Sequence, residues 1–298
     1  MEHLRKTTLF RSAIVTVHDY CCRATQSACG PKEEADVASL AIPRRGVYVK
    51  HVGGEELVGD AVCAMFFNPG EPYRVSHPLP GGDDCTSFHF SKETLCDALS
   101  TYGAAACDDV VPRFDHSHGP LDSATFLSVQ RLRRDLLRGQ AEAGAVEETA
   151  LAILDCVLRQ SYASRDLSRR GRRPATQRAH REWTEGVRCI LNDRVGERLL
   201  LAEIARGVHC SPFHLVRVFK QHTGASIHEY RVRLRLRLAV ERLLQGERNL
   251  TALALELGFA SHAHFCDSFR REFARPPSRL RHDANSFHLH EMSKNLEA

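Results

Sequence analysis

The sequence contains no long hydrophobic run. No stretch of its 298 residues approaches the roughly 18 consecutive apolar residues of a membrane-spanning helix. Residues 1–6 (MEHLRK) also do not begin the continuous apolar segment of a secretory signal, and no obvious small-residue cleavage site follows. We therefore expect a cytoplasmic protein that has no membrane partner.

The usual cysteine patterns of metal sites are also absent. No C-x2-C pair occurs among the eleven cysteines, of which Cys21, Cys22 and Cys29 lie close together while the others are scattered. An odd number of cysteines without a signal segment favours free thiols, many of them buried as small apolar side chains. The sequence therefore predicts no disulfide framework, no structural zinc site and no bound cofactor.

The basic residues are distributed unevenly. With 43% hydrophobic and 26% charged residues, the chain has the composition of a globular protein, and its length suits two domains. Residues 174–298 contain 20 Lys and Arg against 14 Asp and Glu, whereas residues 1–173 contain 21 against 23. This excess is a weak signal alone, but it suits a C-terminal surface that faces phosphate groups.

The first part of the chain is rich in short β-branched and aromatic runs. Residues 14–17, 47–52, 61–67 and 86–90 are such runs, and glycine- or proline-containing turns separate them. Many short strands of this kind predict a sandwich or a small barrel, which we expect to occupy residues 1–120.

The pattern changes to helical spacing from Asp122. Residues 121–165 predict two helices that could pair with each other or with a second subunit. A charged stretch without apolar periodicity indicates an interdomain linker at residues 166–180. Residues 181–285 are expected to form an all-α domain, and residues 286–298 a tail.

One segment of the predicted all-α domain fits two structures. Residues 232–238 alternate between apolar residues and arginine, as a half-buried strand would. The helical interpretation is favoured because no glycine or proline lies between Gly224 and Gly246, and because apolar residues also recur there at helical spacing. We expect a long helix whose arginines face solvent or phosphate.

A supersecondary unit occurs twice near the C-terminus. Its paired positions, at an offset of 50 residues, are Ser211 and Ser261, Leu215 and Phe265, Phe219 and Phe269, and Lys220 and Arg270. In each copy a short helix and a tight turn precede a serine that can cap a second helix. Helix-turn-helix proteins place such a second helix in a DNA groove. Helical hairpins of an ordinary core remain the alternative for one copy, but two copies with matching caps are harder to explain by packing alone.

The residues of both copies match a family pattern. The matching residues are Ala205, Ser211, Phe219-Lys220, Thr223-Gly224, Tyr230, Arg235-Leu236, Ala239, Leu243-Leu244, Ala254, Gly258-Phe259, Ser261, Phe265, Phe269-Arg270, Pro277-Ser278 and Leu280-Arg281. With them, residues 199–281 resemble the C-terminal domain of AraC/XylS-type transcription activators. The resemblance implies an α+β protein with a double helix-turn-helix domain that binds double-stranded DNA and acts on RNA polymerase.

By the same resemblance, the two recognition helices should enter successive major-groove segments. The residues expected to contact base edges are Phe213, Val216, Arg217, His262, His264 and Asp267. Those expected to contact phosphates are Ser211, Lys220, Ser261 and Arg270. Arginine can pair with guanine O6 and N7, which makes Arg217 the best candidate for base recognition.

Two positions depart from the family pattern. Ala274 stands where glycine is usual, so this turn should be tighter or use another backbone angle. Asp267 replaces a residue that is often basic or polar; its carboxylate disfavours nearby phosphates but could accept a hydrogen bond from cytosine N4. We therefore expect the first recognition helix to read more of the sequence than the second.

The family resemblance also implies a sensor in the first half. Such sensors are built as a cupin-like β-barrel, followed by helices that form a homodimer. Arg74 and His77 lie in a stretch that resembles a barrel turn of these sensors and are candidates for binding a small anionic effector, although solvation in a loop is the simpler interpretation.

Two other functions stay open. A metal-dependent cupin enzyme needs a His-x-His motif in a barrel strand, and none of the three such motifs lies in a predicted strand, although His51, His77 and His89 could converge. An architectural DNA-binding protein without an effector is the second alternative. DNA-repair methyl acceptors can carry the same DNA-binding module, but their Pro-Cys-His-Arg sequence is absent here. We predict a regulator that is not an enzyme.

Overall fold

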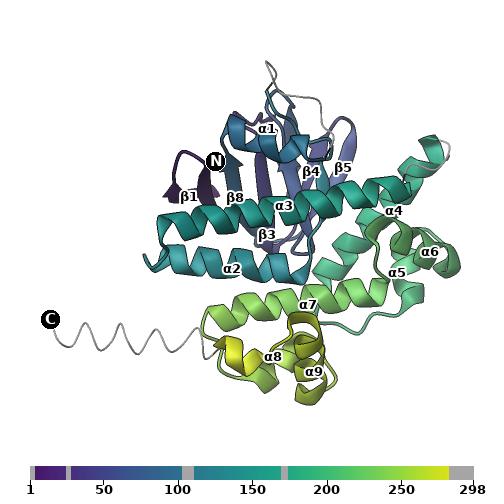
Figure 1. Ribbon diagram of the computed structural model, residues 1–298. Coiled ribbons are helices and arrows are strands. Elements are labelled where there is room, and N and C mark those ends of the chain that lie inside the picture. Colours follow the sequence, from purple (N-terminus) through teal and green to yellow (C-terminus); the bar gives the residue numbers. More distant parts are fainter. Residues whose placement is uncertain (1–3, 25–27, 103–110, 169–173, 282–298) are drawn as a thin grey trace, which may run out of the picture.

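A β-sheet region is followed by a helical region (Figure 1). The computed structural model describes residues 4–24, 28–102, 111–168 and 174–281. The predicted tail, residues 286–298, lies outside the described residues.

The strands form two separate antiparallel sheets. The larger has the strand order β1-β2-β8-β3-β6-β9 and the smaller β5-β4-β7. Their bounds are β1 (Leu4–Arg11), β2 (Val15–Cys22), β3 (Ser39–Gly46), β4 (Tyr48–Val52), β5 (Glu55–Gly59), β6 (Cys63–Phe67), β7 (Tyr73–Ser76), β8 (Asp83–Phe90) and β9 (His118–Pro120). The strands predicted from the β-branched and aromatic runs are confirmed.

The expected cupin-like barrel is not observed. Within the described residues the two sheets share no strand pairing, so both sheets stay open. The chain leaves the larger sheet at Gly46, whose φ of 75° lies in the left-handed region. A Cβ at this position would lie 2.0 Å from the Gly82 carbonyl oxygen. This sharp glycine turn separates β3 from β4, and β4 then pairs with β5 and β7 in the smaller sheet.

The helices follow the strands and continue through the C-terminal half. Their bounds are α1 (Lys92–Ser100), α2 (Ser123–Leu137), α3 (Ala143–Ser168), α4 (Pro174–Asp193), α5 (Leu201–Gly207), α6 (Pro212–Thr223), α7 (Ile227–Leu244), α8 (Leu250–Glu256) and α9 (His262–Phe273). The predicted change to helix at Asp122 is confirmed, because its carboxylate caps α2 by accepting a hydrogen bond from the Thr125 N–H at 2.7 Å. None of the described helices is long and apolar enough to cross a membrane.

Most of the stretch expected to be a linker is helical. Helix α3 extends through Ser168 and α4 begins at Pro174, while residues 169–173 lie outside the described residues. Helix α4 packs against β5 of the sheet region and against α5 and α6 of the C-terminal half. It therefore joins the two halves through packing rather than serving as a spacer.

The larger sheet separates an apolar core from a cavity lined by both polar and apolar side chains. Alternate side chains, among them Val17, Leu40 and Phe88, are fully buried in one core together with residues of α2 and α3. The intervening side chains, among them Ser39 and Ser87, line a cavity on the other face, which the smaller sheet also lines. The two-residue period of a strand thus gives the sheet one face for stability and one for a possible ligand.

Residues 232–238 lie within α7, so the helical interpretation is confirmed. The expectation that its arginines face solvent or phosphate is wrong for two of them. Arg235 is 5% exposed and donates three hydrogen bonds to backbone carbonyl oxygens of the C-terminal half. Arg237 is fully buried and donates to the carbonyl oxygens of Leu121, at 2.6 Å, and Ala61. Hydrogen bonds from both guanidinium groups to surrounding backbone carbonyl oxygens fix α7 in place.

A buried group of charges holds the sheet region to α4 and α7. We call Asp60, Glu185, Arg188 and Tyr230 the Asp60 cluster. Asp60 follows β5 and is fully buried; its carboxylate lies 3.2 Å from the Arg188 Nη2 atom of α4 and accepts a hydrogen bond from the Tyr230 hydroxyl of α7 at 2.7 Å. Burial alone would raise the pKa of Asp60, but the Arg188 guanidinium and the Tyr230 hydroxyl hold this pKa below its ordinary value.

A second group of charges joins the sheets to α7 and α2. Arg44 of β3 is 1% exposed and donates hydrogen bonds to Asp19 of β2 at 2.6 Å and to Glu241 of α7 at 3.0 Å. Arg133 of α2 donates to the same Asp19 carboxylate at 2.9 Å. Together the two clusters hold α7, which bridges the helix-turn-helix units, against the sheet region.

We predict that Asp60→Asn lowers the free energy of unfolding by about 1.5–3 kcal/mol, because the carboxylate accepts hydrogen bonds that involve a charged partner. Chemical denaturation measures this change. Glu182→Gln is the matched control on α4, because Glu182 pairs with Arg178 on the surface at 63% and 79% side-chain exposure. For this control we expect a change of at most about 0.5 kcal/mol. Equal effects of the two substitutions would contradict the role assigned to Asp60.

Candidate nucleic-acid interface

Serine caps begin both predicted recognition helices. The Ser211 hydroxyl accepts a hydrogen bond from the His214 N–H at 3.3 Å at the start of α6. The Ser261 hydroxyl accepts one from the His264 N–H at 3.1 Å at the start of α9. Pro212 occupies the first turn of α6, where a backbone N–H would have no acceptor within the helix, so the N–H that proline lacks is not missed. The duplicated unit inferred from the sequence is therefore present in the structure.

The two units also share their packing. Ala205 of α5 and Ala254 of α8 are buried in the core. Four positions after each alanine the chain turns through a left-handed residue, His209 with φ of 52° in the first unit and Gly258 with φ of 73° in the second. The core-facing side chains of the recognition helices are Leu215, Val218, Phe219, Phe265, Phe269 and Phe273, all buried.

The two recognition helices end in the same backbone conformation. Gly224 ends α6 with φ of 72°, and Ala274 ends α9 with φ of 55°. The expectation of a tighter turn or another backbone angle at Ala274 is therefore wrong. Alanine adopts the left-handed conformation that glycine would otherwise supply, although its Cβ makes this conformation less favourable.

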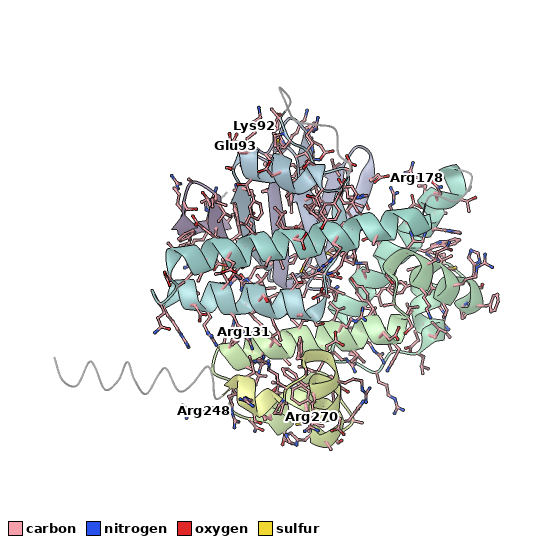
Figure 2. All side chains as sticks on the ribbon, viewed as in Figure 1. Lys92, Glu93, Arg131, Arg178, Arg248 and Arg270 are labelled. Atoms are coloured by element: carbon pink, nitrogen blue, oxygen red, sulfur yellow. The ribbon has the colours of Figure 1, made fainter. Side chains whose placement is uncertain are left out.

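The residues predicted to contact DNA are exposed. On α6 and at its cap they are Ser211, Phe213, Val216, Arg217 and Lys220. On α9 and at its cap they are Ser261, His262, His264, Asp267 and Arg270. Phe213 is 84% exposed, which is unusual for a large aromatic side chain. Figure 2 labels Arg270 on α9, at the edge of the molecule opposite the sheets. Their contacts with bases and phosphates stay predictions.

The two recognition helices differ in charge. Helix α6 contains no acidic residue, and neither Arg217 nor Lys220 has an ion-pair partner among the described residues. On α9, Arg270 Nη1 lies 3.7 Å from Asp267 Oδ1, an exposed ion pair within the helix. The cations of α6 are thus more available to phosphates and bases, as the sequence led us to expect.

Helix α4 supports α6 from behind, which the sequence did not predict. The ring of His214 on α6 lies 5.4 Å from each of the rings of His180 and Trp183 on α4, measured between centroids. Since α4 also carries Arg188 of the Asp60 cluster, it links the first recognition helix to the sheet region. Helix α7 provides a second link, because the ring of its Tyr230 lies 5.4 Å from that of Phe219 on α6.

A cavity of about 460 Å³ lies between the two sheets. It is lined by Tyr20, Tyr48, Tyr73, His77 and His89 together with acidic and small side chains. His77 Nε2 lies 2.7 Å from Asp83 Oδ1 at one end of the cavity. Of the residues predicted to bind an effector, His77 is therefore in place to do so.

Arg74 lies away from this cavity. Because strand residues alternate between faces, Tyr73 of β7 points into the cavity and Arg74 points outward, where it lines a shallow depression with Lys32 and Glu56. The structure therefore does not bring Arg74 and His77 together.

The three histidines that could have converged on a metal do not. His51 lies 2.7 Å from the Ser76 hydroxyl, whereas the ring of His89 packs edge-on against His18 at 4.6 Å. His77 interacts with Asp83. Each ring has a different neighbour, so the histidine set of a cupin metal centre is not formed by these residues.

Sequence comparison assigns the family. The sequence model of a helix-turn-helix domain family matches residues 204–283. The regulatory protein SoxS of Salmonella typhimurium is 34% identical over 104 residues, which make up 35% of this chain and 97% of SoxS. The chain belongs to the AraC/XylS family of transcription regulators. The resemblance inferred from the sequence motifs is thereby confirmed.

Other curated relatives match about a quarter to a third of this chain. AdaA of Bacillus subtilis, a bifunctional transcriptional activator and DNA repair enzyme, is 28% identical over 100 residues, or 34% of this chain and 47% of AdaA. This chain spans between about a quarter and a half of the length of the first curated relatives it matches. A solved AraC-type regulator from Chromobacterium violaceum is 27% identical, covering 38% of this chain and 96% of that one, at a TM-score of 0.34. That score is low, so the family assignment rests on the sequence matches.

We predict that Arg217→Ala in this AraC/XylS-type protein relaxes specificity at one base pair and weakens specific binding by about 1–3 kcal/mol. Dissociation constants are measured for a duplex selected from a random pool, for its single-base variants and for a random duplex. Weakening that is equal on specific and random DNA would show that Arg217 does not read a base.

Lys220→Ala is the matched comparison on the same helix face. Because a phosphate contact carries no sequence information, this change should weaken binding to all duplexes. In a salt titration, the slope of the logarithm of the association constant against the logarithm of the salt concentration should become shallower by about one.

We predict that Ala274→Gly stabilises the protein by about 0.5–1 kcal/mol, because relief of the left-handed strain outweighs the added entropy of glycine in the unfolded chain. Gly224→Ala, at the matching position of α6, should destabilise it. Chemical denaturation of both variants measures these changes, and a loss of stability in Ala274→Gly would contradict the backbone assignment.

Proposed function

We propose that this protein is a sequence-specific regulator of transcription that binds duplex DNA through α6 and α9. The observation that carries the proposal is the pair of serine-capped helices with exposed polar and basic faces, in the segment that matches the helix-turn-helix family model. Insertion of the two helices into successive major-groove segments, and an action on RNA polymerase, complete this proposal by family resemblance.

The regulator responds to a small molecule bound between the sheets. The supporting observation is the cavity of about 460 Å³, which falls within the ~300–1,000 Å³ typical of ligand pockets. Its tyrosines offer apolar rings and hydroxyls, and His77 and Lys6 offer nitrogen atoms for hydrogen bonds. An architectural DNA-binding protein would have no use for such a cavity.

A chain of contacts leads from the cavity to the DNA-binding helices. The ring of Tyr48 lines the cavity and lies flat against Gly59, where an added Cβ would be 2.6 Å from Tyr48 Cζ. The next residue is Asp60, which holds Arg188 of α4 and Tyr230 of α7. A ligand that moves Tyr48 therefore shifts the balance between arrangements of α4 and α7, and with them the recognition helices.

A homodimer formed through the helices that follow the sheets is part of the proposal. The buried faces of α2 and α3 are already used, since they pack on each other and on the sheets. The exposed Leu137 at the end of α2 and Leu151 of α3 remain for a second subunit.

The test of this function is a melting screen against metabolites, followed by DNA binding with each ligand found. A ligand at 100 times its dissociation constant should add about 2.7 kcal/mol of stability. We expect the same ligand to change DNA affinity, and DNA to change ligand affinity by the same factor. Ala41→Leu, which fills the cavity from β3, should abolish the thermal shift while leaving DNA binding without ligand intact. A cavity ligand without any effect on DNA affinity would contradict an effector role.

A further inference from the structure

One end of the cavity gathers sulfur, nitrogen and oxygen donors from three separate segments. Ligand atoms of Cys22, His77 and Asp83 all lie within 4.8 Å of one another. The register of β2 and β8 pairs Cys21 with Asp84, so that Cys22 and Asp83 fall side by side on the cavity face. His77 follows β7 of the smaller sheet and approaches from the opposite side, with its Nε2 atom 2.7 Å from Asp83 Oδ1.

The Asp83 carboxylate lacks a permanently charged partner. It is 7% exposed, and among the described residues its ion-pair partner is His77 alone. The nearby Arg23 and Arg45 are both engaged by Asp84 on the other face, at 2.7 and 2.8 Å. A cation bound at this position would compensate the charge of the buried carboxylate.

Cys85 orients the carboxylate. Its thiol donates a hydrogen bond to Asp83 Oδ2 at 2.9 Å, which leaves Oδ1 directed at His77.

We propose that the Cys22 thiolate, His77 Nε2 and an Asp83 carboxylate oxygen bind one Zn²⁺ ion. Zinc accepts this mixture of donors at about 2.0–2.3 Å, whereas calcium and magnesium require oxygen donors throughout. The charges of one thiolate, one carboxylate and a neutral imidazole balance a divalent ion. Three protein ligands leave a fourth position, which an anion or a thiol entering the cavity can occupy.

The ion would join the two open sheets. Two of its ligands belong to β2 and β8 of the larger sheet, and the third follows β7 of the smaller sheet. Its binding is therefore expected to hold the sheets together at one end of the cavity. Because the ion binds the protein alone, this inference can be tested independently of DNA binding.

The test uses the full chain, reduced and freed of metal with a chelator, and Co²⁺ alone as the probe. Tetrahedral cobalt bound to a thiolate gives intense ligand-field bands and a sulfur-to-cobalt charge-transfer band in the near ultraviolet. We expect both to saturate at one equivalent of Co²⁺ and to disappear when Zn²⁺ is added. Absence of the charge-transfer band in the wild-type protein would overturn the proposal, whatever the behaviour of the variants.

The variants assign the ligands. Cys22→Ser should remove the charge-transfer band, whereas Cys156→Ser on α3, remote from the cavity, should leave it unchanged. Cys85→Ala should keep the band but weaken metal affinity about 10–100-fold, because it removes only the group that orients Asp83. A band that persists in Cys22→Ser would place the metal elsewhere and refute this site. If Cys22→Ser does not fold, His77→Asn is the second test and should weaken the binding of Co²⁺. An unchanged affinity for Co²⁺ in that variant would also refute this site.

Discussion

Asp60 is a fully buried carboxylate whose charge is bound by side chains from two helices of the C-terminal half. Its partners Arg188 and Tyr230 come from α4 and α7, the helices that support the first recognition helix and bridge the two units. Buried ion pairs add little net stability compared with apolar packing, but an alternative arrangement would leave a charge unpaired. This constraint gives the C-terminal helices one defined position relative to the cavity, and the charge group around Arg44 reinforces it.

The two helix-turn-helix units are alike in architecture and unequal in chemistry. Both have a serine cap, a buried alanine in the scaffold helix and a left-handed residue at the end of the recognition helix. Helix α6 presents Arg217 and Lys220 with no acidic residue on the same helix, whereas Arg270 on α9 pairs with Asp267. Duplicated packing with divergent surfaces suits a protein in which one unit reads bases and the other mainly sets orientation.

The helix-turn-helix domain was predictable from the sequence because its caps, turns and core residues are local signals with fixed spacing. The strands were predictable for the same reason. Whether the sheets close into a barrel was not predictable, because closure depends on which distant strands pair. The buried positions of Arg235 and Arg237 could not be predicted because their acceptors are backbone carbonyl groups remote in sequence. The grouping of Cys22, His77 and Asp83 could not be predicted either, because β2, β8 and the segment after β7 bring together residues that share no motif.

The central claim is that this chain binds duplex DNA through two recognition helices with a phosphate-facing surface. The most direct measurement is the dissociation constant of the full chain for duplex DNA as a function of salt concentration. The account predicts that the logarithm of the association constant falls linearly with the logarithm of the salt concentration, with a slope that reflects several neutralised phosphates. Absence of duplex binding at low salt, or binding that salt does not weaken, would contradict it.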